Sequence, residues 1–358
     1  MAGNGRGPNT PITRDEVAAA VGAVQQLGSI TKAAAALGVD RVSVRRRLNL
    51  ALRFGLDDPT APPPTTAAHF EVAKPPSPDE PIEELLARKR LRFDRQKANK
   101  DASELIHVKV KAKGPMGLLV FGDPHIDNDG CDIEALERDL DVISRDSGIY
   151  GLNLGDLTDN WVGRLARLYA HSSTTAADGV RLMEWMLRDR NWLAVIAGNH
   201  DMWQGSDLIQ WILRNSGTAF SPHGIRLQLN FPRGDPIRIH ARHDFKGHSM
   251  YNPTHGHVRE TREGYRDHLL LAGHRHHDHY QIMPSKAAGF PMHLARVSGY
   301  KVIDGYADEL GLHEARLAPS VCFVIQPEHP KPVERIRPFW DALEAEDFIA
   351  WLRKRGAA

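Results

Sequence analysis

Five short apolar runs recur along the C-terminal two-thirds of the chain, and each one ends at a cluster of polar residues. The runs cover residues 118–121, 149–154, 193–197, 237–241 and 269–272. Stretches long enough for helices separate them, and this alternation is typical of a layered α/β or α+β domain. The pattern therefore predicts five strands inside one domain, which we expect to span residues 106–329.

A different pattern occupies residues 10–56, where three helical segments follow one another. They lie at residues 15–27, 31–37 and 41–53. Between the second and third segments, Gly38 can adopt the positive φ of a tight turn, and Asp40 can cap the next helix. This layout predicts a small all-α helix-turn-helix domain at the N-terminus.

The faces of the second and third segments support the same interpretation. Small side chains would let the second helix approach the third; they are Ala33, Ala34 and Ala35. The apolar side that packs back on them would consist of Val42, Val44 and Leu48. The outer side would present four residues suited to a major groove or to phosphates, namely Ser43, Arg45, Arg46 and Arg47.

Residues 57–105 connect the two patterns. Up to residue 81 the composition shifts to Pro, Ala and Thr, which favours an extended, polyproline-like linker. Residues 82–100 then have helical character and are strongly basic, so they are expected to form a connecting helix or a phosphate-contacting arm, with an ordinary solvated helix face as the alternative. At the other end, residues 330–358 are expected to form a proline-rich tail with a final helix near 340–352.

Composition narrows these possibilities. The chain has 358 residues, of which 41% are hydrophobic, so it can bury a substantial core. No apolar run approaches the roughly 20 residues that span a bilayer, and residues 1–9 lack a secretory signal, so we expect a cytoplasmic protein without a membrane partner. Cys131 and Cys322 are expected to be packed residues and not a disulfide framework. The net charge of +1 means that any affinity for nucleic acid must come from local patches.

Histidine is the unusual component of this sequence. There are 19 in the chain, and many fall between His240 and His279, which suggests metal binding. Several of them stand in the polar clusters that end the apolar runs. The clusters read Gly122-Asp123-Pro124-His125, Gly155-Asp156-Leu157-Thr158-Asp159-Asn160, Gly198-Asn199-His200-Asp201, Arg242-His243-Asp244 and Gly273-His274-Arg275-His276. Any one cluster has a structural explanation, such as a capping Asp or a hydrogen-bonded His. Five in succession, each at a strand end, predict one shared site.

The order Asp-x-His, Gly-Asp-x-x-Asp, Gly-Asn-His-Asp, lone His and Gly-His-x-His resembles the calcineurin-like metallophosphoesterases over about residues 118–283. The resemblance implies a four-layered α/β/β/α sandwich that binds two divalent cations. It implies that one cation is held by Asp123, His125 and His276, that the other is held by Asn199, His243 and His274, and that Asp156 bridges them. Such mixed ligands suit Mn, Fe or Zn better than Ca, and Mn²⁺ is the expected metal.

The same resemblance implies a mechanism, in which the cations ionise a bridging water and the hydroxide attacks phosphorus in line. His200 would stabilise charge or protonate the leaving oxygen, and Asp201 would orient its ring. His243 is favoured as the lone histidine because it lies beyond the strand end. His240, mid-strand on the opposite face, would be a surface residue, and His248 stays an alternative. Other nearby histidines are expected to be loop residues or substrate contacts, namely His255, His257, His277 and His279.

The resemblance defines a reaction class but no substrate. The N-terminal segment resembles helix-turn-helix units of phage and prophage proteins, with a three-helix interaction or oligomerisation domain as the alternative. A tethered DNA-binding module would concentrate DNA at the catalytic domain. The prediction is therefore a binuclear DNA nuclease, similar to the repair exonucleases of this superfamily. Its DNA path would be lined by Lys246, Arg259, Arg262 and Arg266. Two alternatives stay open: a phosphomonoesterase or cyclic nucleotide phosphodiesterase on a small substrate, and a non-enzymatic DNA-binding component with a structural metal site.

Overall fold

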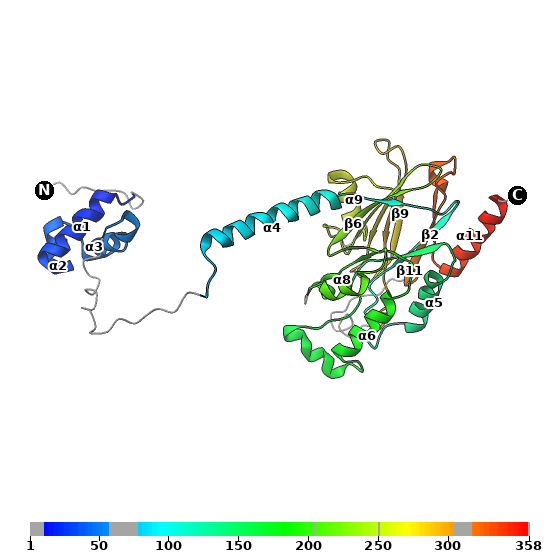
Figure 1. Cartoon of the computed structure of the whole chain (residues 1–358), viewed down its shortest axis with the longest axis horizontal. Helices are drawn as coiled ribbons and strands as arrows, with labels where there is room; N and C mark the ends of the chain where they lie inside the picture. Colours follow the sequence, from blue (N-terminus) through cyan, green and yellow to red (C-terminus); the bar gives the residue numbers. More distant parts are fainter. Residues whose placement is uncertain (1–10, 57–77, 204, 250, 304–316, 357–358) are drawn as a thin grey trace. The chain divides into compact units, whose positions relative to one another are not determined.

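The structure, a computed structural model, describes residues 11–56, 78–203, 205–249, 251–303 and 317–356. The chain divides into two compact units, Met1–Ile82 and Glu83–Ala358 (Figure 1). Most of the predicted linker, residues 57–77, lies outside the described residues. None of the described helices has the length and apolar character that crossing a membrane requires.

The N-terminal unit consists of three helices, as predicted, which are α1 (Arg14–Leu27), α2 (Ile30–Leu37) and α3 (Arg41–Leu48). Gly38 ends α2 with a φ of 63°, and the Asp40 side chain accepts a hydrogen bond from the Ser43 amide at 2.8 Å. Both turn predictions are therefore confirmed. The third helix is shorter than predicted, because a 3₁₀ turn at Leu52–Phe54 follows it.

Two packing predictions for this unit are wrong. Val44 and Leu48 are buried as expected, but Val42 is 76% exposed and Ala35 is also exposed. The cause is the helical period, because residues two apart point to nearly opposite sides of a helix. Val42 therefore lies on the outer side of α3 together with the arginines.

The second unit contains two six-stranded mixed sheets. The β2 sheet has the strand order β12 (Ile336–Phe339), β11 (Ser320–Ile325), β2 (Met116–Phe121), β3 (Ile149–Asn153), β4 (Trp192–Ile196) and β5 (Ala219–Ser221). The β7 sheet has the order β1 (Ile106–Lys109), β6 (Gly224–Asn230), β7 (Ile237–Arg242), β8 (Leu269–Ala272), β10 (Met292–Arg296) and β9 (His279–Met283). The five predicted runs are strands β2, β3, β4, β7 and β8.

Helices cover the outer sides of both sheets. The β2 sheet packs against α5 (Ile133–Ser144), α6 (Ala176–Leu187), α8 (Asp207–Leu213) and α11 (Ala342–Gly356). The β7 sheet packs against α9 (His255–Glu263). A second apolar core lies between the sheets, where Leu118 and Val120 of β2 belong to the same buried cluster as Ile239 of β7 and Leu271 of β8. The predicted α/β/β/α arrangement is confirmed.

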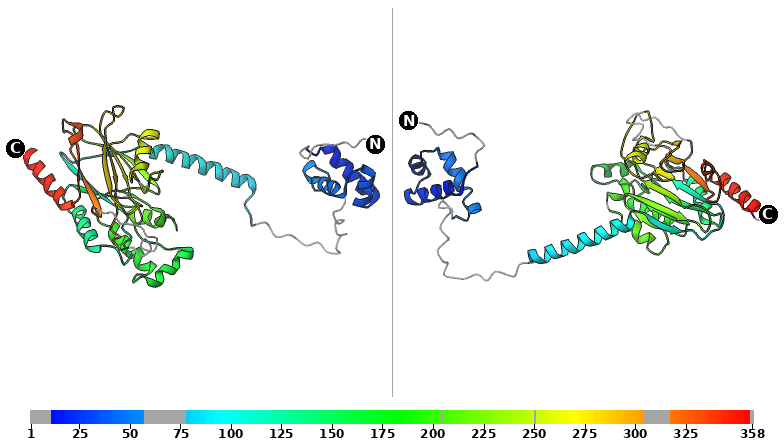
Figure 2. Two further views of the ribbon diagram at one scale, coloured as in Figure 1. Left: turned by 180° about the vertical axis from the view of Figure 1, so that it is seen from behind. Right: turned by 90° about the horizontal axis from the view of Figure 1, so that it is seen from above.

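The ends of this unit differ in their packing. Helix α4 (Ile82–Ser103) buries none of its side chains. In the segment predicted to be a tail, by contrast, β12 pairs with β11, and Ala342, Ala345 and Ile349 of α11 are buried against the β2 sheet. Figure 2 shows α11, in red, alongside the sheets. The described part of this segment thus belongs to the α/β unit. Cys322 is buried in the same core, and both cysteines are free.

Outside the polar clusters, four histidines are buried in or beside the β7 sheet: His240, His257, His268 and His293. The prediction of a surface position for His240 is wrong, because α9 folds over that face and the ring packs against Phe245. Burial lowers the pKa of His240, His257 and His268 to about 3 and that of His293 to about 4. Part of the histidine enrichment therefore serves packing.

These buried histidines make stability depend on pH, and His268 allows a clean test. Its Nδ1 accepts a hydrogen bond from the Arg238 amide at 3.1 Å, and its ring stacks on Phe290. Because the folded-state pKa is below the ordinary value of 6.5, the unfolded chain binds more protons, and stability falls as the pH drops from about 6.5 towards 3. Between pH 7 and 5, the free energy of unfolding should decrease by about 2 kcal/mol because of His268.

His268→Asn keeps an acceptor for the amide but does not titrate in this range. Urea unfolding in the presence of a chelator should therefore show a pH dependence weaker than that of the wild-type chain by about this 2 kcal/mol. The matched control is His223→Asn at an exposed histidine, which should keep the wild-type dependence. Equal pH dependence in His268→Asn and the wild-type chain would contradict the assignment.

Candidate metal centre

The strand order explains how the five polar clusters meet. In the β2 sheet, β2, β3 and β4 are parallel neighbours, and in the β7 sheet β7 and β8 are parallel neighbours. The carboxyl ends of parallel neighbours open on one edge of a sheet. The two edges converge, because His243 after β7 lies 2.9 Å from the Asn199 side chain after β4.

Four donor atoms form the first part of the centre. The Nε2 atom of His243 lies 2.9 Å from Asn199 Oδ1, 3.0 Å from His274 Nδ1 and 3.2 Å from Asp156 Oδ2. The opposite ring nitrogen, Nδ1, lies 2.9 Å from the Leu154 carbonyl oxygen, so a hydrogen bond there leaves Nε2 facing the centre. Two ligands about 2.1 Å from one cation and at right angles to it are about 3 Å apart. The spacing fits a transition-metal cation.

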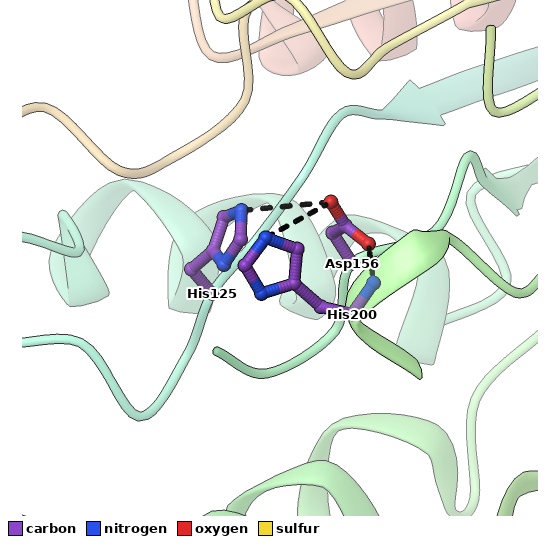
Figure 3. A group of neighbouring side chains, drawn as sticks. All are labelled: His125, Asp156 and His200. Carbon is purple, nitrogen blue, oxygen red and sulfur yellow. Dashed lines mark hydrogen bonds and ion pairs between the residues drawn. The ribbon is translucent and has the colours of Figure 1, made fainter. Parts of the chain in front are cut away.

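The second part of the centre is wider. His125 Nε2 lies 3.9 Å and His200 Nε2 lies 4.0 Å from Asp156 Oδ2 (Figure 3). Asp123 Oδ2 lies 3.5 Å from His276 Nε2. Three buried atoms of these residues make no hydrogen bond with the described residues: His125 Nδ1 lies 2.8 Å from Asp159 Oδ1, and the other two are Asp123 Oδ1 and His125 Nε2. Buried polar atoms are seldom left unpaired, and a cation would satisfy both.

All seven residues predicted as metal ligands are thus brought together: Asp123, His125, Asp156, Asn199, His243, His274 and His276. The ligand atoms of His125, Asp156 and His200 lie within 4.8 Å of one another, as do those of Asp156, His243 and His274. Asp156 belongs to both groups, which is the position expected of a bridging carboxylate. Of the three histidines considered near the end of β7, only His243 takes part, because His240 lies under α9 and His248 is exposed.

The backbone around the centre is constrained. Six described residues other than glycine have a positive φ, and four of them are predicted ligands: His125 at 42°, Asp156 at 51°, His274 at 72° and His276 at 50°. This region of φ is unfavourable for such side chains, and it tends to occur where function requires it. At Gly198, a Cβ atom would collide with the Asp156 carboxylate, so glycine is required there.

The pKa values of the buried carboxylates and imidazoles in the centre are strongly shifted. Burial raises the pKa of Asp123 to about 7. Burial also acts to raise the pKa of Asp156, but His243 outweighs it and the pKa is lowered. Burial opposes a charge on His243 as well, yet Asp156 and Asp123 raise its pKa to about 10. Two buried carboxylates beside several imidazoles form a donor set whose charge divalent cations would balance.

Residues behind the ligands hold them in place. Asp159, a motif residue without a predicted role, lies 2.8 Å from His125 Nδ1 through its Oδ1 and accepts a hydrogen bond from Asn128. Its pKa is lowered to about 2, because the His125 contact outweighs the effect of burial. Such a carboxylate fixes the orientation of a ligating imidazole.

The predicted contact between Asp201 and the His200 ring is not present. Asp201 accepts hydrogen bonds from the amides of Gly198 and Leu157, at 2.8 and 3.1 Å, and so joins two loops of the centre. The reason is that adjacent residues of a helical turn point to different sides. The ring nitrogen Nδ1 of His200 lies instead 2.6 Å from the Asp159 carbonyl oxygen.

The residues predicted to contact DNA differ in whether their side chains are exposed or already paired with another side chain. Arg45 and Arg46 are exposed on α3, whereas Arg47 pairs with Glu16 at 3.1 Å and the Ser43 hydroxyl donates to Asp40. In the second unit, three residues of the predicted DNA path are exposed, namely Lys246, Arg262 and Arg266. The fourth, Arg259, pairs with Glu263 at 2.7 Å.

No protein-family profile matches the chain, and no curated protein matches its sequence. Solved structures are similar in part, among them the following three. A predicted phosphoesterase from Streptococcus pneumoniae TIGR4 is 11% identical, with 64% of this chain and 100% of that chain covered and a TM-score of 0.29. Vps29 from Entamoeba histolytica, complexed with zinc, is 13% identical (63% and 97% covered, TM-score 0.31). GAP50 from Plasmodium, described as the anchor in the inner membrane complex, is 10% identical (67% and 95% covered, TM-score 0.31).

Proposed function

We propose that this chain is a binuclear metal-dependent phosphodiesterase that hydrolyses DNA. The observation that carries the proposal is the position of Asp156. Its carboxylate lies in both groups of potential ligands, 3.2 Å from His243 on one side and 3.9 Å from His125 on the other. A pair of divalent cations requires such an arrangement around one shared carboxylate. We propose Mn²⁺ as the metal.

Asp123, His125 and His276 would hold one cation, and Asn199, His243 and His274 the other. When bound, such a pair polarises phosphoryl oxygens and lowers the pKa of water. The Leu154 carbonyl and the Asp159 carboxylate fix the rings of His243 and His125 with Nε2 towards the centre. This orientation leaves the two imidazoles ready to coordinate without a change of rotamer.

His200 is placed to act on the substrate. Its ring Nδ1 can donate to the Asp159 carbonyl, which leaves Nε2 facing the centre, and Asn160 donates to its backbone carbonyl at 2.7 Å. When the ring is doubly protonated, its Nε2–H can donate a hydrogen bond to a phosphoryl oxygen or pass its proton to the leaving oxygen, and the neutral ring stays with its Nδ1–H on the Asp159 carbonyl. Burial lowers the pKa of His200, so the proton it carries is readily given up.

DNA as substrate is supported by the N-terminal unit. In the proposed helix-turn-helix, α3 would be the second helix, and its exposed side carries Arg45 and Arg46. Arginines at this position in such units contact phosphates and base edges in the major groove. Tethering this unit to the centre would raise the local concentration of DNA there.

A substrate panel in Mn²⁺ tests this function. The full chain is expected to cleave DNA and, more slowly, a small aryl phosphodiester. Removal of residues 1–56 should lower cleavage of DNA by at least about tenfold and leave the aryl diester unaffected, because only DNA uses the tether. The measurement is kcat/KM for each substrate, with single-stranded DNA, double-stranded DNA and a cyclic nucleotide in parallel.

The double variant Arg45→Ala/Arg46→Ala is the matched control for the deletion, since it keeps the unit and removes only its exposed charge. It should reproduce most of the loss on DNA. Equal losses on DNA and the aryl diester would contradict a targeting role for this unit. A preference for the cyclic nucleotide would indicate the small-substrate alternative, and no hydrolysis of any substrate by a metal-loaded chain would indicate a structural metal site.

A further inference from the structure

Two tryptophans surround the His200 ring. The ring of Trp203 lies 4.1 Å from it, centroid to centroid, at an interplanar angle of 35°, and Trp161 lies 5.2 Å away at 68°. In the sequence, each tryptophan closely follows a ligand cluster, Trp161 after Asp159-Asn160 and Trp203 after Asp201-Met202. The turns that place the candidate ligands thus also place two indole rings beside them.

The two rings are not equally accessible. Trp161 is half-buried, and its ring has the buried Lys301 ammonium 5.8 Å from its centroid. Trp203 is 37% exposed although one side of its ring packs on His200. The two tryptophan centroids are 6.1 Å apart, whereas a ring inserted between them would need about 7 Å, or two stacking distances. The accessible stacking surface is therefore the outer face of Trp203.

Other exposed tryptophans of the unit have a cation over their rings. Arg190 lies over the Trp185 ring at 5.3 Å, and Arg214 lies over the Trp211 ring at 4.1 Å. Among the described residues, no arginine or lysine lies over Trp203. An exposed aromatic face without a cation, directly beside the residue that faces the candidate metal centre, is suited to a flat, uncharged ring of the substrate.

We propose that Trp203 stacks on the nucleobase next to the scissile phosphate and thereby selects nucleotides whose bases are unpaired. This inference rests on the proposed hydrolysis of DNA and names the form of DNA used. In a duplex, each base is covered on both faces by its neighbours, so it cannot reach an indole ring without unstacking. In a single strand the bases are free to stack, and a stacked base contributes about 1–3 kcal/mol of binding.

The test compares two single-stranded substrates of equal length, an oligothymidylate and an oligomer whose bases are missing near the cleaved bond. The wild-type full chain in Mn²⁺ should cleave the oligothymidylate with a kcat/KM about tenfold or more above that of the abasic oligomer. Trp203→Ala should lose this preference through a loss on the oligothymidylate alone. Trp203→Phe should retain most of it, because phenylalanine also stacks.

Trp185→Ala is the matched control, since Trp185 is similarly exposed and does not contact His200. It should keep the wild-type preference. If Trp203→Ala lowers hydrolysis of both oligomers equally, Trp203 serves only to support His200 and the inference is overturned. If the wild-type chain cleaves an aryl diester but neither oligomer, the proposed nucleic-acid substrate fails, and the inference fails with it.

Discussion

Replacement of Asp156 by alanine is expected to abolish hydrolysis and to reduce the metal content of the protein. The carboxylate is 2% exposed, accepts a hydrogen bond from the His200 amide at 2.9 Å and lies 3.2 Å from His243 Nε2. Since it belongs to both ligand groups, its loss weakens both cation sites at once. Metal stabilisation of a phosphoryl-transfer transition state contributes several kcal/mol, so kcat/KM should fall by about 10³-fold or more.

Elemental analysis of protein resupplied with manganese, together with hydrolysis of a small aryl diester, measures both effects. Asp156→Asn is the informative companion, because an amide oxygen can still accept from the His200 amide while the negative charge is gone. It should keep the fold and lose most of the activity. The control is Asp129→Ala, at an exposed carboxylate outside the centre. Wild-type metal content and turnover in Asp156→Ala would exclude a binuclear centre at this place.

The sequence predicted those parts of the site whose position follows from a short stretch of neighbouring residues. An apolar strand followed directly by Gly-Asp or Gly-Asn marks a strand end that carries ligands, and parallel pairing then brings such ends together. His243 could be distinguished from His240 in the same way, because the side chains of a strand alternate in direction. The α/β/β/α layers follow from the same strands and the helices between them.

The wrong predictions for His240 and for the C-terminal segment concern contacts made by distant segments, unlike those for Val42, Ala35 and Asp201, which concern local helix geometry. Nothing near His240 indicates that α9 will cover it, and the buried position of His268 depends on Phe290, 22 positions later in the numbering. The packing of α11 depends on the pairing of β12 with β11. The few apolar residues of 336–339 are too short a run to predict that strand. Some of the clustered histidines therefore lie in the candidate metal centre and others are packing residues, and tertiary contacts decide between the two positions.

The exchange of His200 for asparagine is expected to leave both metal sites occupied and to lower turnover by about 10²–10⁴-fold. The reason lies in the geometry of the ring. Its Nε2 faces the centre at 4.0 Å from Asp156 Oδ2, farther than the 3.2 Å of His243, and the ring also packs on Trp203. The contacts with Trp203 and the Asp159 carbonyl hold this nitrogen towards the place where the substrate would lie. The distance itself also fits a ligand, since Nε2 of the candidate ligand His125 lies 3.9 Å from the same oxygen.

The ligand groups nevertheless allow a competing role, because His200 shares one group with His125 and Asp156. The two roles separate in a measurement of metal content: loss of a cation in His200→Asn would make His200 a ligand and contradict its role as acid. A second measurement uses the leaving group. If Nε2 protonates the leaving oxygen, His200→Asn should slow the cleavage of an alkyl ester far more than that of a p-nitrophenyl ester, because nitrophenolate leaves without a proton. Equal slowing of both esters, with the metal retained, would instead assign His200 to the stabilisation of charge on the phosphoryl oxygens.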